Sequence, residues 1–322
     1  MTGTMTGTMT GTVTAPVAAM HGLLLRMAAF TRDEVLVAAR RQLAAGSSAG
    51  AAEALLAEHA TLPLTLDDLG VLSATGVAPG AVRPVPSEPP VPWRFRAAPG
   101  DGAADVRMTA LVGAVGGEPA VHGLWRALRL PWKASATTTA RLVHVVEAGD
   151  GDLAGLTGRL QLALSQAGDP VPLVEVVATG AQAPAYQRMA RAYGALVWAA
   201  TAEPEIVVVH APTFSPDHPV LAADDRDRVL AYLRAGTVLL RSSATETDVR
   251  DPGLGPVVPC GYRTDGVWIW SDAVTHYLDR HGLAPDPRLL DRIRSARTEP
   301  PVLDAVAVHR ALSRVLASAS SR

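Results

Sequence analysis

The polar residues best suited to catalysis or ligand binding in this 322-residue sequence lie between His210 and Asp227. His210 ends a run of β-branched residues that predicts a strand, and Asp217 and His218 follow in the same connection. Ligands of open α/β sheets bind at the carboxyl ends of strands, so this loop is a candidate site. Its side chains could ligate a metal ion or act as acid and base. The alternative is an ordinary loop whose acidic residues favour the start of the next helix.

The single cysteine, Cys260, could act as a nucleophile with His276 or His281 as its base. That chemistry needs a lowered thiol pKa and a histidine within hydrogen-bonding distance. The spacing shows neither, and a lone cysteine is often a small buried apolar residue. One cysteine also excludes an intrachain disulfide and a cysteine-based zinc site. We therefore expect neither a metal site nor a cofactor, and no catalytic residue beyond the candidates His210, Asp217 and His218.

Two glycine-rich runs, at 113–117 and 149–155, could cradle a phosphate where a strand leads into a helix. Neither matches a nucleotide-binding motif, so ordinary turns are expected and no cofactor-binding residue is assigned. Arg188 and Arg191 share a predicted helix with Tyr186, which could bind phosphate or RNA but is more typical of a solvated face. The formal net charge of −2 gives no global attraction to nucleic acid.

The stretch from Pro256 to Ile293 carries the densest turn and cap signals of the chain. Asp265-Gly266 predicts a two-residue type I′ turn of a β-hairpin. Trp268 and Trp270 share one face of its second arm, because alternate side chains of a strand point the same way. They are predicted to be core residues or, if exposed, contacts for a protein partner. Two helices, capped by Ser271 and Asp286, are predicted to follow.

This stretch resembles the closing segment of an uncharacterised actinobacterial family of the Streptomyces type. The motifs that carry the resemblance are R-T-D-G-x-W-x-W (Arg263–Trp270), Y-L-x-x-H-G (Tyr277–Gly282) and P-x-P-x-L-L-x-x-I (Pro285–Ile293). The similarity covers residues 170–295, and similar segments occur near polymorphic toxin–immunity modules. It implies an accessory or immunity-type role and brings no catalytic residues with it. Lys133 is the only lysine among 29 basic residues, which is typical of a high-GC genome.

The order of predicted elements indicates an α/β fold, or an α+β fold with a mixed sheet. Strands and helices alternate after residue 93, with a strand at 106–115, helices at 120–129 and 184–199, and the hairpin closing one edge of a mostly parallel sheet. Thr31 and Glu34 predict a capping box in the helical part. The expected organisation is a disordered MTGT-repeat tail (1–19), a small helical module (20–76), a proline-rich linker (77–92) and an α/β domain (93–322).

We expect an interaction or regulatory accessory protein that acts through its surface on a protein partner. The alternative is an enzyme or small-ligand binder at His210, Asp217 and His218. No apolar run is long enough for a membrane helix, and the N-terminus lacks the features of a signal peptide. The expected location is therefore the cytoplasm, without membrane contact and with nucleic acid a disfavoured partner.

Overall fold

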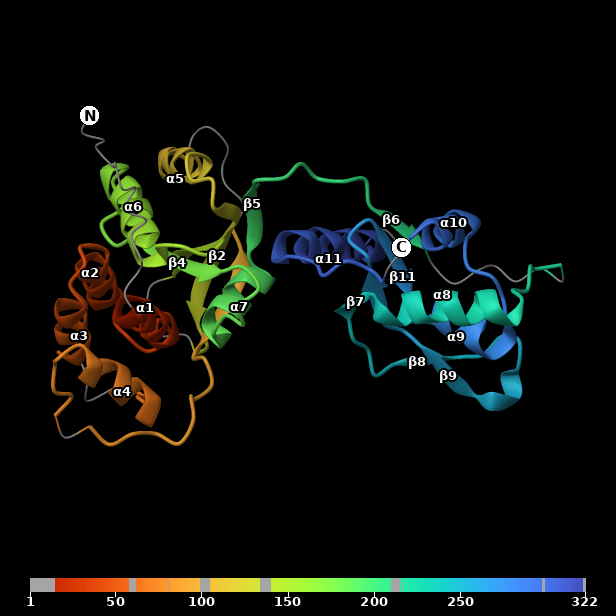
Figure 1. Cartoon of the computed structure of the whole chain (residues 1–322), viewed down its shortest axis with the longest axis horizontal. Helices are drawn as coiled ribbons and strands as arrows, with labels where there is room; N and C mark the ends of the chain where they lie inside the picture. The colour runs from red at the N-terminus through yellow and green to blue at the C-terminus, as the bar shows by residue number, and fades with distance from the viewer. Residues whose placement is uncertain are drawn as a thin grey trace, which may run out of the picture. The chain divides into compact units, whose positions relative to one another are not determined.

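The computed structural model describes residues 15–57, 62–80, 82–98, 105–133, 140–209, 215, 217–296 and 299–320. The chain divides into two units, Met1–Thr201 (unit 1) and Ala202–Arg322 (unit 2), shown in Figure 1. Helices and mixed sheets confirm the expected α/β class. Among the described helices, none is long and apolar enough to cross a membrane.

The division into units differs from the predicted domain boundary. The proline-rich segment 77–92 lies inside unit 1, because the helices before it pack on the sheet that follows it. The tail predicted to be disordered, residues 1–19, overlaps a helix that begins at Ala15; residues 1–14 lie outside the described part.

Unit 1 begins with four helices and continues with strands and helices in mixed order. The elements are α1 (Ala15–Met27), α2 (Asp33–Ala44), α3 (Ser48–Leu56), α4 (Leu66–Ala74), β1 (Trp93–Ala97), α5 (Val106–Gly116), β2 (Val121–Pro131), β3 (Arg141–Ala148), α6 (Leu153–Gln166), β4 (Leu173–Ala178), α7 (Ala185–Tyr193) and β5 (Ala195–Ala199). The four N-terminal helices agree with the all-helical character predicted for residues 20–76.

The sheet of unit 1 has the order β1-β2-β3-β4, with β5 also paired to β2. β1 pairs with the C-terminal half of β2 and β5 with its N-terminal half, both antiparallel. Only the β3–β4 pair is parallel, so the prediction of a mostly parallel sheet is wrong here. Apolar residues of α5 and α6 pack on one face against β2, β3 and β4.

Helices α1 and α2 close the free edge of β4. His21 donates from Nε2 to the carbonyl of Val176 (2.9 Å), and Arg40 donates from Nη1 to that of Val174 (2.9 Å). Arg40 also forms a bidentate ion pair with Glu175, at 2.7 and 2.5 Å. Unpaired strand edges are prone to association, so this covering protects the sheet and ties the helices to it.

Two predicted elements of unit 1 have the wrong type, and a third is wrong in its second part. Residues 106–115 form α5 because Asp105 caps that helix, its carboxylate accepting from the amide of Met108. Residues 120–129 form β2, since pairing with three strands overrides the helix-favouring residues of this segment. The predicted helix 184–199 stops at Tyr193, and β5 follows after Gly194.

The predicted capping box of α2 is absent, and an equivalent one begins α4. Arg32, not Thr31, is the N-cap of α2, and the Thr31 hydroxyl donates to the carbonyl of Met27 instead. At α4, Thr65 accepts from the amide of Asp68 while the Asp68 carboxylate accepts from the Thr65 amide. This reciprocal pair of hydrogen bonds is a capping box.

Unit 2 is built around a second, smaller sheet. Its elements are β6 (Val207–Val209), α8 (Ala223–Ala235), β7 (Thr237–Leu240), β8 (Thr245–Thr247), the 3-10 helix η3 (Pro252–Leu254), β9 (Pro256–Pro259), β10 (Tyr262–Thr264), β11 (Trp268–Ser271), α9 (Asp272–His281), α10 (Pro287–Ser295) and α11 (Ala305–Ser320). The sheet order is β6-β11-β10-β7, and β8 and β9 form a separate ribbon.

The predicted hairpin is present as β10 and β11, but it occupies the middle of the sheet instead of an edge. β11 lies parallel to β6, and β10 lies antiparallel to β7. Helices α8, α9 and α10 cover one face of the sheet and α11 covers the other. Both faces of the sheet are therefore buried, which agrees with the apolar side chains on both sides of β11.

The turn of the hairpin differs from the predicted type I′ turn. Thr264 pairs with Ile269, so four residues separate the paired positions. Asp265 has no positive φ, whereas Gly266 has φ of +95°. The Asp265 carboxylate instead accepts from the amides of Val267 (3.0 Å) and Trp268 (2.7 Å), so the aspartate organises the turn through its side chain.

Gly236, between α8 and β7, is expected to tolerate no side chain. A Cβ at this position would lie 2.3 Å from Cζ2 of Trp270, which is fully buried. We expect Gly236→Ala to destabilise unit 2 by about 1–3 kcal/mol, the usual cost of overpacking a core. Thermal unfolding measures the effect, with Ala235→Ser at the exposed neighbouring position as the control. Equal melting temperatures for the two variants would contradict this packing argument.

Candidate functional site

Two of the three residues of the predicted loop site, Asp217 and His218, lie in the described part of the chain. Asp217 is exposed, and His218 is held by a hydrogen bond between its Nε2 and the carbonyl of Ala284 (2.9 Å). His210 lies outside the described residues. The backbone of the same loop bonds to the α9–α10 connection through Leu221 and Ala284. Asp217 and His218 therefore lie in a loop that packs on this connection.

The two tryptophans of the hairpin have different environments. Trp270 is fully buried, and its Nε1 donates to the carbonyl of Leu233 at 3.3 Å. It belongs to the core and offers no surface to a partner. Trp268 is half-buried, and the guanidinium of Arg288 lies 5.8 Å from its ring centroid. Only Trp268 therefore remains a candidate for a role near the surface.

The other sequence candidates have structural roles. Arg191 pairs with Glu147 (2.9 Å) and lies over the Trp125 ring (5.7 Å), and Tyr186 is buried. Gly113 lies within α5, so no phosphate-binding turn exists there. Tyr186 and Arg191 therefore pack on the sheet, so the expected solvated face is wrong for these two residues, and Gly113 lies in a helix where an ordinary turn was expected.

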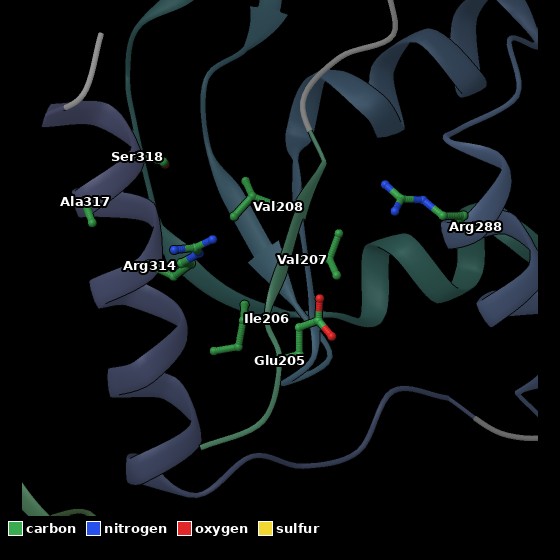
Figure 2. Close-up of a pocket in the computed structure, with 8 residues that line it drawn as sticks. All are labelled: Glu205, Ile206, Val207, Val208, Arg288, Arg314, Ala317 and Ser318. Atoms are coloured by element: carbon green, nitrogen blue, oxygen red, sulfur yellow. The ribbon is translucent and has the colours of Figure 1, made fainter. Parts of the chain in front are cut away.

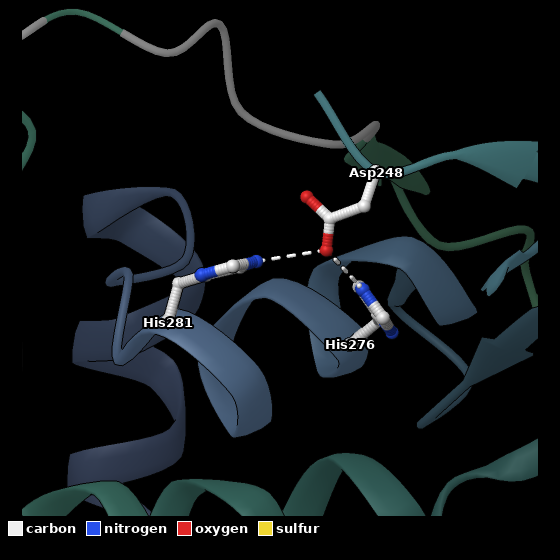
Figure 3. A group of neighbouring side chains, drawn as sticks. All are labelled: Asp248, His276 and His281. Carbon is white, nitrogen blue, oxygen red and sulfur yellow. Dashed lines mark hydrogen bonds and ion pairs between the residues drawn. The ribbon is translucent and has the colours of Figure 1, made fainter. Parts of the chain in front are cut away.

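His276 and His281, the predicted bases for Cys260, are hydrogen-bonded to Asp248 instead. Both histidines donate from Nε2 to the same oxygen of Asp248, Oδ2, at 2.9 and 2.8 Å (Figure 3). The thiol of Cys260 instead faces the carbonyl of Val258 at 3.9 Å. Burial raises the pKa of the Cys260 thiol, and the charge of Glu246 raises it further, which opposes thiolate chemistry.

Asp248, His276 and His281 form a carboxylate–dihistidine cluster, named here the Asp-His-His cluster. Asp248 follows β8 and is fully buried, whereas both histidines come from α9 and are partly exposed. The second carboxylate oxygen of Asp248 accepts from the amides of Arg250 (2.9 Å) and Asp251 (3.2 Å). The carboxylate is thus fixed with Oδ2 toward the two imidazoles.

Tyr277 positions the rings of this cluster. Its ring stacks on that of His281, with centroids 5.9 Å apart, and meets the ring of His276 edge-on at 5.2 Å. Its hydroxyl accepts from the amide of Val249, next to Asp248, at 3.2 Å. Burial alone would raise the pKa of Asp248, but hydrogen bonds from His281, His276 and two amides outweigh it and hold that pKa well below its usual range.

A groove runs along the free edge of β6 between α10 and α11 (Figure 2). Its volume of about 470 Å³ is within the range of ligand sites. It is lined by the segment 205–208, by Arg288 of α10, and by Arg314, Ala317 and Ser318 of α11. Arg314 lies on the side of Val208 and Arg288 on the side of Val207, so cationic groups flank both faces of the strand.

The backbone of β6 is available on the groove side. Among the described residues, β6 pairs only with β11, and the amide of Val207 donates to the carbonyl of Val267 (2.9 Å). Backbone groups of successive strand residues point to opposite sides, so the amide and carbonyl of Val208 face the groove. Arg314 is exposed and forms no ion pair with a described residue. The edge of β4 is covered by Arg40 and His21, whereas this edge borders an open groove.

Sequence reasoning missed Asp248 and the groove. Both histidines were singled out, but as bases for Cys260, because the aspartate lies 28 residues before His276 and no spacing rule links them. The groove depends on which strand becomes the sheet edge, and three consecutive valines give no such signal. Arg288 lies in the predicted helix that follows Asp286, and its position there gave no sign that it lines a groove.

Comparison with protein-family models, with curated proteins and with solved structures gives no match for this chain.

Proposed function

We propose that this chain is an interaction factor that binds an extended, acidic segment of a partner protein along the free edge of β6. The observation that carries the proposal is the open groove at an edge strand with an arginine on each face. Extended peptides add to such edges by forming main-chain hydrogen bonds, while flanking pockets and charges select their side chains. The proposed role is regulatory or accessory, and the proposed compartment is the cytoplasm.

The chemistry of the proposed segment follows from the groove. Val208 offers one amide and one carbonyl to an added strand, which gives affinity without sequence preference. Arg288 and Arg314 would face alternate side chains of that strand, so acidic residues are favoured on both of its faces. The side chain of Arg288 is 72% exposed and rests over Trp268, which leaves its outer nitrogens accessible.

The test selects peptides from a random phage-displayed library on the full chain and measures their affinities by fluorescence anisotropy. We expect acidic, extended sequences to be enriched. Val208→Pro removes the amide that faces the groove and is expected to weaken binding at least about tenfold, or about 1.4 kcal/mol. Proline is tolerated on edge strands, so this variant should fold.

Arg288→Glu combined with Arg314→Glu is expected to weaken the same peptides by a similar or larger factor, since repulsion replaces attraction. Arg280→Glu, an exposed charge reversal on α9 outside the groove, is the matched control and should bind as the original chain does. Failure to enrich any peptide, or equal binding by the groove variants, would reject the proposal. Self-association that is lost in Val208→Pro would instead identify a second copy as the occupant and also reject it.

A further inference from the structure

Among the described residues, each buried carboxylate except one pairs with an arginine. Asp68, Glu147, Glu175 and Asp265 are buried, and each pairs with an arginine: Arg26, Arg191, Arg40 and Arg292, respectively. Asp248 is fully buried as well, but its described partners are two histidines and two backbone amides. A buried charge is costly unless it is paired, and Asp248 has no arginine partner among the described residues.

We propose that Asp248, His276 and His281 bind a divalent transition-metal ion of the zinc type. Two imidazole nitrogens and one carboxylate oxygen are a common ligand set for such ions, and three protein ligands leave one position for water or another ligand. The cation compensates the buried charge of Asp248 that no arginine neutralises. This site is independent of the groove at β6.

The geometry fits an ion after a small displacement. One ligand atom from each of the three residues lies within 4.8 Å of the other two. Two ligands of a zinc ion, each at about 2.0–2.1 Å in tetrahedral arrangement, lie about 3.3 Å apart. The present distances from Oδ2 to the Nε2 atoms, 2.8 and 2.9 Å, therefore need to open by a few tenths of an ångström. In the metal-bound tautomer the imidazole proton lies on Nδ1, which leaves Nε2 of each ring to bind the ion.

The surroundings hold the ligands in place as metal sites require. The amides of Arg250 and Asp251 occupy the second carboxylate oxygen, which leaves Oδ2 for the ion. Tyr277 contacts both imidazole rings and is tied to the backbone next to Asp248. Such outer-shell contacts orient the ligands and commonly contribute 10–100-fold to metal affinity.

The test titrates zinc into the chelator-treated full chain by calorimetry and cobalt(II) by visible absorption. We expect one ion per chain and a rise in melting temperature on adding zinc. His276→Gln and His281→Gln keep an amide donor toward Asp248, so they should fold, but they should bind the ion more than about 100-fold more weakly, beyond the usual outer-shell effect. His218→Gln, in the same unit and outside the cluster, is the control and should bind normally.

Absence of saturable binding, or equal binding by the two glutamine variants, would overturn the proposal. The cluster would then be a purely hydrogen-bonded structural element. Peptide binding at the β6 groove is measured separately, so either proposal can fail without the other.

Discussion

Replacing Arg40 by methionine is expected to lower the free energy of unfolding by about 3–5 kcal/mol. The guanidinium is fully enclosed and donates to both oxygens of Glu175 and to the carbonyl of Val174. Methionine fills much of the same volume but leaves the carboxylate of Glu175 buried, with the amide of Gln187 (2.7 Å) as its one remaining donor among the described residues. The loss is therefore that of an uncompensated buried charge, not of packing alone.

Urea unfolding followed by circular dichroism measures this loss, with hydrogen exchange to assign the transition to unit 1. Arg159→Met is the control, because Arg159 forms a similar bidentate pair with Glu118 but its side chain is 54% exposed. Exposed pairs contribute at most about 1 kcal/mol. The double variant Arg40→Met with Glu175→Met removes both charges and should recover part of the loss. Similar costs for Arg40→Met and Arg159→Met would contradict the assignment.

The same ion pair joins the N-terminal helices to the sheet, although the sequence suggested that they form a separate module. The helices of residues 20–76 are marked by local signals, and the prolines after them are typical of a linker. What joins them to the sheet is a long-range contact between Arg40 and Glu175, which are 135 positions apart. An arginine in an amphipathic helix is usually exposed, so nothing local indicated that this one is buried.

Local signals succeeded where the structure depends on local hydrogen bonds. The helices predicted after Ser271 and Asp286 are both present, Asp286 accepts from the amide of Arg288, and Gly282 ends α9 with φ of +69°. They failed at α5 and β2, where tertiary pairing decides the conformation. The hairpin was recognised, but its position in the middle of the sheet follows from pairing with β6 and β7, which no turn signal specifies.

The candidate functional residues were harder to predict than the helices and strands, because their contacts come from distant parts of the sequence. His276 and His281 were identified as candidate bases. Their partner Asp248 was not identified, because it follows β8 and lies far from α9 in the sequence. Trp268 and Trp270 were predicted to share a face of the strand, but they differ in burial. Trp270 lies in the core with residues of α8 and α9, whereas Trp268 is half-buried beside Arg288. Residue type pointed to these places, and only the fold determined what each residue contacts.

Lowering the pH from 7 to 5 is expected to destabilise unit 1 by about 2 kcal/mol for each of two buried histidines, His21 and His144. Burial lowers the pKa of each imidazole to about 4, and the positive charges of Arg40 near His21 and Arg126 near His144 favour the neutral form further. Both residues are neutral in the folded chain at neutral pH, and His21 is also fixed by its bond to Val176.

The sign follows from proton binding in the two states. In the unfolded chain a histidine has its usual pKa of about 6.5, so between pH 6.5 and 4 the unfolded state binds more protons than the folded state. Stability from these groups is complete above pH 6.5, falls as the pH decreases, and changes no further below about pH 4. His144→Gln can keep an amide donor while removing one titrating group, so it should reduce the pH-dependent loss by about half. Urea unfolding of the original chain and this variant at pH 7, 6 and 5 measures the difference, and parallel pH profiles for the two proteins would show that His144 is not the group responsible.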